Sequence, residues 1–90
     1  MQEIMNALRN IPAGDDLTVV IEGDVVRVVN DATGEVVNDR EARLVRRNGK
    51  LEIHVYQTGK ILTILPIKTY SAFDTAQSIL DLILENDDEI

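Results

Sequence analysis

Several residue types that support common protein chemistry are absent or rare in this chain of 90 residues. Cysteine is absent, which excludes disulfide bonds, thiolate nucleophiles and cysteine-based zinc sites. The single histidine, His54, cannot form a two-histidine metal site within one chain. No apolar run approaches the roughly 20 residues that a membrane-spanning helix needs. We therefore expect no metal, no cofactor and no membrane partner.

Motifs for catalysis and phosphate binding are also missing. Ser71 and Ser78 are the only serines, and neither lies in a glycine elbow. The five glycines are spaced one per predicted turn, whereas a phosphate-cradling loop needs them close together. The adjacent Asp15 and Asp16 lack the alternating ligand spacing of a calcium loop. Because the pattern places no base, acid or nucleophile to act with His54 either, we predict that the protein is not an enzyme.

The composition is that of an ordinary globular domain, with 44% hydrophobic and 28% charged residues. Ninety residues suffice for one domain, so we expect residues 1–90 to fold as a single unit. A small domain without cysteine, and without a basic-then-apolar signal sequence at its start, fits the cytoplasm better than a secreted environment.

Hydrophobic periodicity predicts a helix near each end of the chain. Residues 2–10 place apolar side chains at helical spacing, and Pro12 ends that helix. Ser71 is a residue type that favours the N-cap and begins a second helix. Residues 86–90 are acidic, and anions at a helix C-terminus oppose the macrodipole, so we expect them to form a frayed tail.

Between the helices the apolar residues alternate with the period of two that is typical of strands. Gly23-Asp24 and Asn48-Gly49 have the residue types of two-residue hairpin turns. The predicted strands are 17–22, 25–30, a short sixth candidate at 35–37, 41–47, 50–56 and 61–65. The fold class is therefore α+β: an antiparallel five- or six-strand meander sheet with a short N-terminal helix and a C-terminal helix packed on one face.

The alternation also predicts which apolar side chains are buried. We expect the core to contain Leu8, Val19, Ile21, Val28, Leu44, Ile53, Val55, Leu62, Ile64, Phe73, Leu80 and Ile83. A second set lies outside this pattern and forms a candidate homodimer interface, because gathered exposed apolar groups often mark one. Its members are Val20, Val25, Val29, Leu82 and Leu84.

The net charge of −7 hides a marked segregation. Residues 40–50 hold five bases and one acid, whereas residues 1–39 hold two bases and eight acids. The register of the Asn48-Gly49 hairpin pairs Arg47 with Lys50 and places His54 opposite Arg43. We therefore expect one outward face with a cationic ladder, on which His54 is a surface histidine. This face contains Arg43, Arg47, Lys50, His54 and Tyr56.

Two functions of different classes fit this charge pattern. The first is a non-enzymatic, acidic protein-interaction module, an inhibitor or adaptor that binds a basic surface of a protein partner. By analogy of size and charge alone, a phage or mobile-element anti-defence protein such as an anti-CRISPR protein is an example. The acids expected to face the partner lie mostly in loops near strand ends: Asp15, Asp16, Glu22, Asp24, Asp31, Glu35 and Asp39.

The alternative is a nucleic-acid or anionic-ligand binder that works through the Arg43, Arg47 and Lys50 ladder with His54 and Tyr56. Nucleic acid is the less favoured partner, because the rest of the chain is acidic and few aromatic rings are available for stacking. The same charges also fit a purely protective role, in which they discourage edge-to-edge association of strands.

Overall fold

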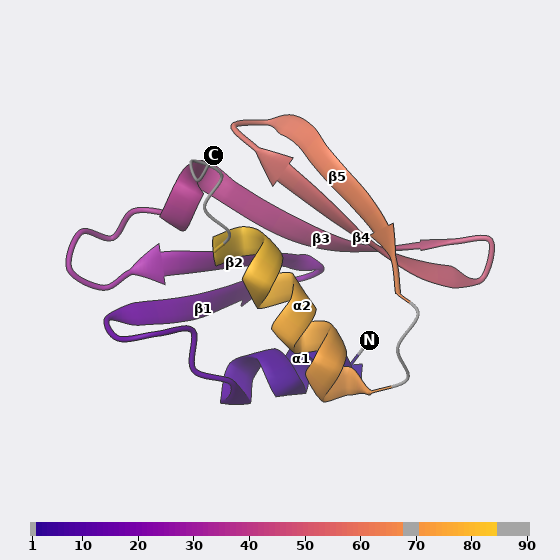
Figure 1. Ribbon diagram of the computed structural model, residues 1–90, viewed down its shortest axis with the longest axis horizontal. Helices are drawn as coiled ribbons and strands as arrows, with labels where there is room; N and C mark the ends of the chain where they lie inside the picture. The colour runs from indigo at the N-terminus through magenta and orange to yellow at the C-terminus, as the bar shows by residue number, and fades with distance from the viewer. Residues whose placement is uncertain (1, 68–70, 85–90) are drawn as a thin grey trace.

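The computed structural model describes residues 2–67 and 71–84, which form a five-stranded antiparallel sheet with a helix at either end of the chain (Figure 1). The strands follow the chain order β1-β2-β3-β4-β5, so the sheet is a meander. The elements are α1 (Gln2–Asn10), β1 (Leu17–Glu22), β2 (Val25–Asn30), η1 (Val37–Asp39), β3 (Arg40–Arg47), β4 (Lys50–Gln57), β5 (Lys60–Pro66) and α2 (Ala72–Leu84). The predicted α+β class is therefore confirmed.

The residue types at the turns determine the registers of the two predicted hairpins. Gly23 has a φ of 62°, as the first central residue of a type II′ turn requires, and Glu22 pairs with Val25 across it. Asn48 and Gly49 both have positive φ, 52° and 77°, as a type I′ turn requires. The resulting pairs are Arg47 with Lys50 and Arg43 with His54, as predicted.

The predicted sixth strand at 35–37 does not form. Val36 makes one isolated bridge to Val29, and the chain then enters the short 3-10 helix η1. Asn38 and Asp39 have φ values of 59° and 53°, a left-handed conformation that cannot continue an extended strand. As a consequence β2 and β3 pair at only two positions, Val25 with Arg43 and Val26 with Ala42, before they separate.

Both helices lie on the same face of the sheet, and α2 crosses β2, β3 and β4 (Figure 1). The apolar side chains of this face and of the helices form one core. Its buried members are Ile4, Met5, Leu8, Ile11, Val26, Val28, Ala42, Leu44, Ile53, Val55, Ala76, Ile79, Leu80 and Ile83. Neither described helix has the length and apolarity that crossing a membrane would need.

Polar contacts hold both ends of α2. At its start Ser71 accepts a hydrogen bond from the amide of Asp74, which confirms the predicted N-cap. At its end the guanidinium of Arg40 donates to the carbonyl of Leu82 over 2.7 Å, and the side-chain amide of Asn38 donates to the carbonyl of Ile83. Arg40 is only 2% exposed. It therefore serves the last turn of the helix, where a cation also complements the macrodipole, instead of the outward charged surface.

Part of the predicted core is wrong. Phe73, Leu62 and Ile64 are 58%, 44% and 42% exposed. The buried stripe of α2 runs through Thr75, Ala76, Ile79, Leu80 and Ile83, and Phe73 falls at its margin. Ile64 pairs with His54 and so lies on the outer face, away from the helices, and Leu62 lies at the β-bulge of β5, beyond the strands that α2 crosses. Val19 and Ile21, on the strand at the opposite edge, are half-buried. The predicted tail at 86–90 lies outside the described residues.

We predict that truncation of Leu80 and truncation of Phe73 have very different effects on stability. Leu80 is 2% exposed, so Leu80→Ala should lower the free energy of unfolding by about 2–5 kcal/mol. Phe73→Ala should lower it by less than about 1 kcal/mol, because most of the ring is already in solvent. Urea-induced unfolding measures both values. A Phe73→Ala variant as unstable as Leu80→Ala would contradict the position of Phe73 at the margin of α2.

Candidate functional site

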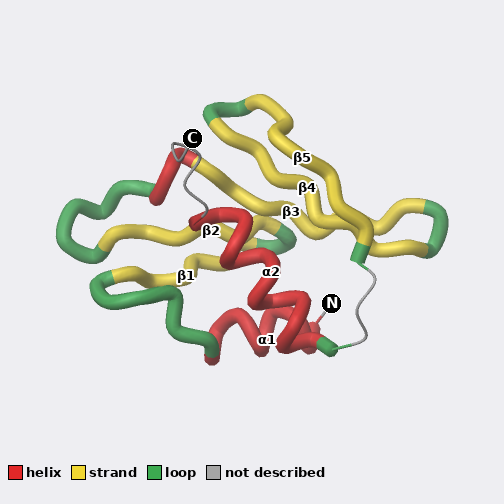
Figure 2. The backbone as a smooth tube through the Cα atoms, in the orientation of Figure 1, coloured by secondary structure: helices red, strands yellow, loops and turns green. Residues whose placement is uncertain are grey.

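Four of the seven predicted acids lie together at one end of the β1–β2 hairpin. Asp15 and Asp16 precede β1, and Asp31 and Glu35 follow β2, in two loops that lie side by side (Figure 2). The amide of Asp31 donates to the carbonyl of Asp16 over 2.8 Å, and this bond joins the two loops. All four acids are exposed. We refer to Asp15, Asp16, Asp31 and Glu35 as the acidic end.

Asn30 organises the second of these loops. Its side-chain oxygen accepts hydrogen bonds from the amides of Ala32 and Thr33, at 2.9 and 3.2 Å. Its backbone amide donates to the carbonyl of Glu35, and its carbonyl accepts from the amide of Gly34. Asparagine at this position therefore closes the turn with its side chain as well as with its backbone, which gives the acidic end a defined shape.

The hydroxyl of Thr18 donates to the carboxylate of Asp31 over 2.7 Å. Within the described ranges, however, none of the four carboxylates of the acidic end forms an ion pair. Their charges are therefore free to face a partner.

The other three predicted acids lie elsewhere. Glu22 and Asp24 flank the turn at the far end of β1 and β2, about 20 Å away for strands of six residues. Glu22 is moreover bound to Arg27, at 2.7 Å. Asp39 lies beside the Thr58-Gly59 turn, where its carbonyl accepts from the amide of Thr58. Because exposed charges are screened within about 8 Å at physiological salt, the acidic end acts separately from Glu22 and Asp24.

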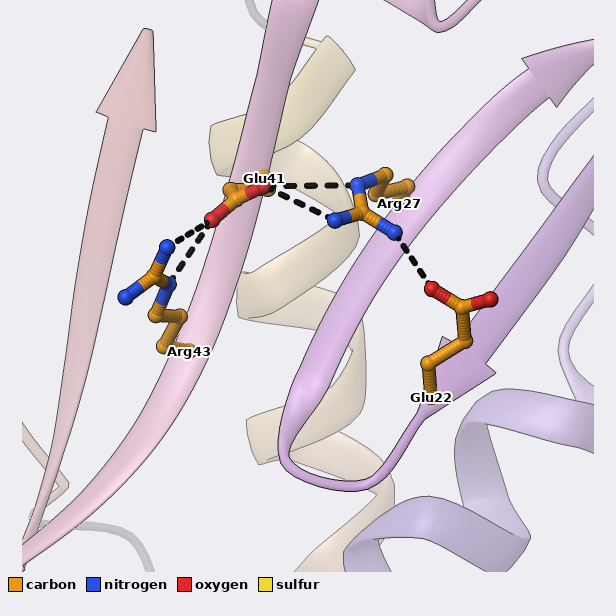
Figure 3. A network of polar contacts seen from close by, with 4 residues as sticks. All are labelled: Glu22, Arg27, Glu41 and Arg43. Carbon is orange, nitrogen blue, oxygen red and sulfur yellow. Dashed lines mark hydrogen bonds and ion pairs between the residues drawn. The ribbon is translucent and has the colours of Figure 1, made fainter. Parts of the chain in front are cut away.

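A chain of charged side chains runs across the sheet face opposite the helices (Figure 3). Glu41 accepts from Arg27 on one oxygen, at 3.2 and 3.3 Å, and from Arg43 on the other, at 2.6 and 2.7 Å. Arg27 also binds Glu22. One carboxylate thus bridges β2 and β3 where their backbones have separated. Beside this bridge is an open cleft of about 760 Å³, lined by Arg27, Asp39, Glu41, Arg43, Tyr56 and Thr58 among others.

The two arginines keep Glu41 charged. Partial burial alone would raise the pKa of Glu41, but the hydrogen bonds and charges of Arg43 and Arg27 outweigh it. The pKa of Glu41 therefore lies below its ordinary value near 4.5. The hydrogen bond to Glu22 raises the pKa of Arg27, against a smaller opposite effect of burial.

The predicted cationic ladder is largely neutralised by neighbouring acids. Arg43 is bound to Glu41, and its guanidinium carbon lies 4.5 Å from the centre of the Tyr56 ring, a cation–π contact. Arg47 approaches Glu52 to 3.8 Å. Lys50 is exposed at the hairpin tip and has no ion pair among the residues that the structure describes. The free positive charge of this face is thus confined to the tip of the β3–β4 hairpin.

The prediction that His54 is a surface histidine is wrong. His54 lies opposite Arg43, as expected, but it is only 8% exposed. Its ring is covered because Ile64 of β5 lies on its other side in the register. Its Nε2 lies 2.9 Å from the carboxylate of Glu52. His54 is therefore occupied within the sheet and does not form part of an open anion-binding surface.

Sequence reasoning missed Arg27 and Glu41 as the centre of the charged face. The pairing of Glu41 with Tyr56 follows from the Asn48-Gly49 turn, but the neighbour relation between Glu41 and Arg27 crosses from β3 to β2. These strands are joined by a long loop with a helical turn, which leaves no simple register signal. Residues 2–67 and 71–84 contain no group of three metal-ligating side chains.

Comparisons with protein-family models, with curated proteins and with solved structures find no match to this chain.

We predict that Glu41→Gln lowers the free energy of unfolding at pH 7 by about 1–2 kcal/mol, because two guanidinium groups lose a shared carboxylate at a partly exposed site. A carboxylate with a lowered pKa stabilises the fold above its unfolded pKa, and this stabilisation is lost as the pH falls through its folded pKa. The difference between Glu41→Gln and wild type should therefore be constant above about pH 5 and shrink below pH 4.5.

Denaturant unfolding at a series of pH values measures this difference. Glu22→Gln is the matched control, since Glu22 is 69% exposed and binds only one arginine, so its effect should be smaller. Equal losses in the two variants, or a Glu41→Gln difference that stays unchanged down to pH 3, would show that the shared carboxylate does not stabilise the sheet.

Proposed function

We propose that this protein is a non-enzymatic interaction module whose acidic end binds a basic surface of a protein partner. The observation that carries the proposal is the unequal pairing of the two kinds of charge. Arg27, Arg43 and Arg47 are bound to carboxylates of the same sheet face, and Arg40 is buried against α2. The four carboxylates of the acidic end face solvent without such partners among the described residues.

The geometry of the acidic end suits binding through charge. Its four carboxylates extend from two loops that the backbone hydrogen bond from Asp31 to Asp16 joins, so they can meet one basic surface at the same time. Complementary potential raises the association rate and selects among partners, although each exposed charge adds little affinity by itself. A cationic groove of a nucleic-acid-handling enzyme is one such surface. An inhibitor that occupies it, as an anti-CRISPR or other phage protein would, is the form of the proposal that we favour.

The alternative, anion binding by the β3–β4 hairpin, has a narrower basis than the sequence indicates. Of its five predicted residues, Arg43 and Arg47 are paired with acids and His54 is buried. Lys50 remains, with Arg46 near it on the opposite face of the hairpin tip, and both are exposed. Two exposed bases beside a largely acidic surface are a weak basis for binding phosphate.

The proposal predicts that neutralising the acidic end weakens binding to a polycation more than removing the same charge elsewhere. The test variant combines Asp15→Asn, Asp16→Asn, Asp31→Asn and Glu35→Gln. The control variant combines Glu3→Gln, Asp24→Asn, Asp74→Asn and Asp81→Asn, which are also exposed acids, so both variants change the net charge by +4. Binding to immobilised poly-L-lysine should weaken about tenfold or more in the test variant and clearly less in the control.

Asparagine suits these positions, because Asp16 already has a φ of 61° and Asp31 accepts its hydrogen bond through an oxygen that asparagine retains.

A heparin column provides the opposite probe, a polyanion. If poly-L-lysine binding weakened equally in both variants, only the net charge would matter. That result would contradict the proposal that the acidic end is the binding site. Retention on heparin that is lost in Arg46→Glu with Lys50→Glu would favour the hairpin instead.

A further inference from the structure

The last strand, β5, presents large apolar side chains on both of its faces. Ile61, Leu62, Ile64 and Leu65 are 51%, 44%, 42% and 39% exposed. The register places Leu65 opposite Ile53, on the helix side, and Ile64 opposite His54, on the outer side. Large exposed apolar side chains therefore lie on both sides of this strand, and exposed apolar groups gathered in this way often mark an interaction site.

The outer edge of β5 also has no strand beside it. β5 is the last strand of the sheet and pairs with β4 alone among the described elements (Figure 1). The amide of Ile67 donates to the carbonyl of Leu51, and antiparallel strands alternate their hydrogen-bonding direction. Thr63 and Leu65 therefore point their backbone groups toward β4, whereas Ile64 points its amide and carbonyl toward the open edge. An apolar edge of this kind is a template for another strand.

The order of residues along β5 makes the strand complementary to itself. An antiparallel copy centred on Ile64 would place Ile64 opposite Ile64, Thr63 opposite Leu65 and Leu62 opposite Pro66. Each of these pairs is uncharged, and the amide and carbonyl of Ile64 would each find a partner in the second copy. A two-fold interface requires this kind of self-complementarity, because the same patch serves both copies. The β-bulge between Ile61 and Thr63 and the missing amide of Pro66 confine the pairing to the middle of the strand.

The charge distribution also favours a second copy at this edge. Two molecules of charge −7 repel each other, and the acidic end lies in the loops before β1 and after β2, at the opposite side of the sheet. β5 contains no acid, and its only charged residue is Lys60. Three strand spacings, about 14 Å, separate β2 from β5, which exceeds the screening distance of about 8 Å at physiological salt. Pairing at β5 therefore keeps the acidic ends of the two copies far apart.

We propose that β5 pairs antiparallel with β5 of a second copy, about a two-fold axis at Ile64, to form a continuous ten-stranded sheet. This interface is separate from the acidic end. It also differs from the homodimer surface predicted from the sequence, whose members do not lie on one face. Val20, Val25 and Val29 lie on the outer face of the sheet, whereas Leu82 and Leu84 pack against the core on the helix side. The dimer leaves both acidic ends exposed at its extremities.

Sedimentation velocity over about 5 to 500 μM tests the proposal directly. The wild-type protein should form a concentration-dependent dimer, and Ile64→Lys should be monomeric, because two lysines would then face each other at the axis. Phe73→Lys is the matched control, since it replaces another exposed apolar residue and should leave the dimer intact. A wild type that stays monomeric over the whole range, or a dimer lost in Phe73→Lys and kept in Ile64→Lys, would overturn the proposal.

Crosslinking provides a second measurement that does not depend on the folding of Ile64→Lys. The chain contains no cysteine, so a single introduced thiol has only its copy in another molecule as a partner. Directly opposed hydrogen-bonded residues have Cα atoms about 5.5 Å apart, within the range for a disulfide. Ile64→Cys should therefore form a linked dimer under mild oxidation, and Phe73→Cys should not. Equal crosslinking of the two variants would contradict pairing at β5.

Raising the salt concentration separates this interface from the proposed function. The dimer should become tighter because salt screens the repulsion between acidic copies, whereas binding of the acidic end to poly-L-lysine should weaken. A dimer that does not tighten with salt would contradict the pairing at β5 alone. Poly-L-lysine binding that does not weaken with salt would contradict the proposed function alone.

Discussion

The carboxylate of Glu41 is the interaction on which the charged surface of this protein depends. β2 and β3 exchange only two residue pairs before they separate, and beyond that point Glu41 joins them by binding Arg27 and Arg43 at once. The same contact neutralises two of the bases on the outer face. With Arg40 buried under α2 and Arg47 close to Glu52, the free charge of the described surface is predominantly negative and is densest at the acidic end. A structural bridge between two strands therefore decides which sign of charge is free to meet a partner.

A second constraint is the limited cover that two short helices provide for five strands. α1 and α2 have nine and 13 residues, and α2 packs across β2, β3 and β4. β5 remains outside this layer, with apolar residues on both faces and an open edge. The sheet consequently has two unlike margins: a charged one on the β1–β2 side and an apolar one at β5. We propose that the first binds a basic partner and that the second pairs with another copy of the chain.

Local features of the fold could be predicted from the sequence because they depend on local chemistry. Gly23 and Asn48-Gly49 determine two hairpins and their registers, and the helix boundaries follow from Pro12 and Ser71. Burial could be predicted less well, since alternation shows which face a residue occupies but not whether anything covers that face. Alternation within β5 also does not show which of its faces meets the helices: Ile64 pairs with His54 and so lies on the outer face. His54 is buried because of a strand that follows it in the chain. Glu41 binds both Arg27 and Arg43 because of the register between β2 and β3. These strands are joined by a long loop, and no local sequence signal determines their register.

We infer that the free charge of the described surface is predominantly negative and is densest at the acidic end. Nuclear magnetic resonance of the nitrogen-15-labelled protein, titrated separately with a tetralysine peptide and with inorganic pyrophosphate, tests it residue by residue. We expect tetralysine to shift the amide resonances of residues 15–18 and 31–35 most strongly, and pyrophosphate to leave those of residues 43–54 in place. Tetralysine shifts spread evenly over acids such as Glu3 and Asp81, or pyrophosphate shifts centred on the β3–β4 hairpin, would contradict it.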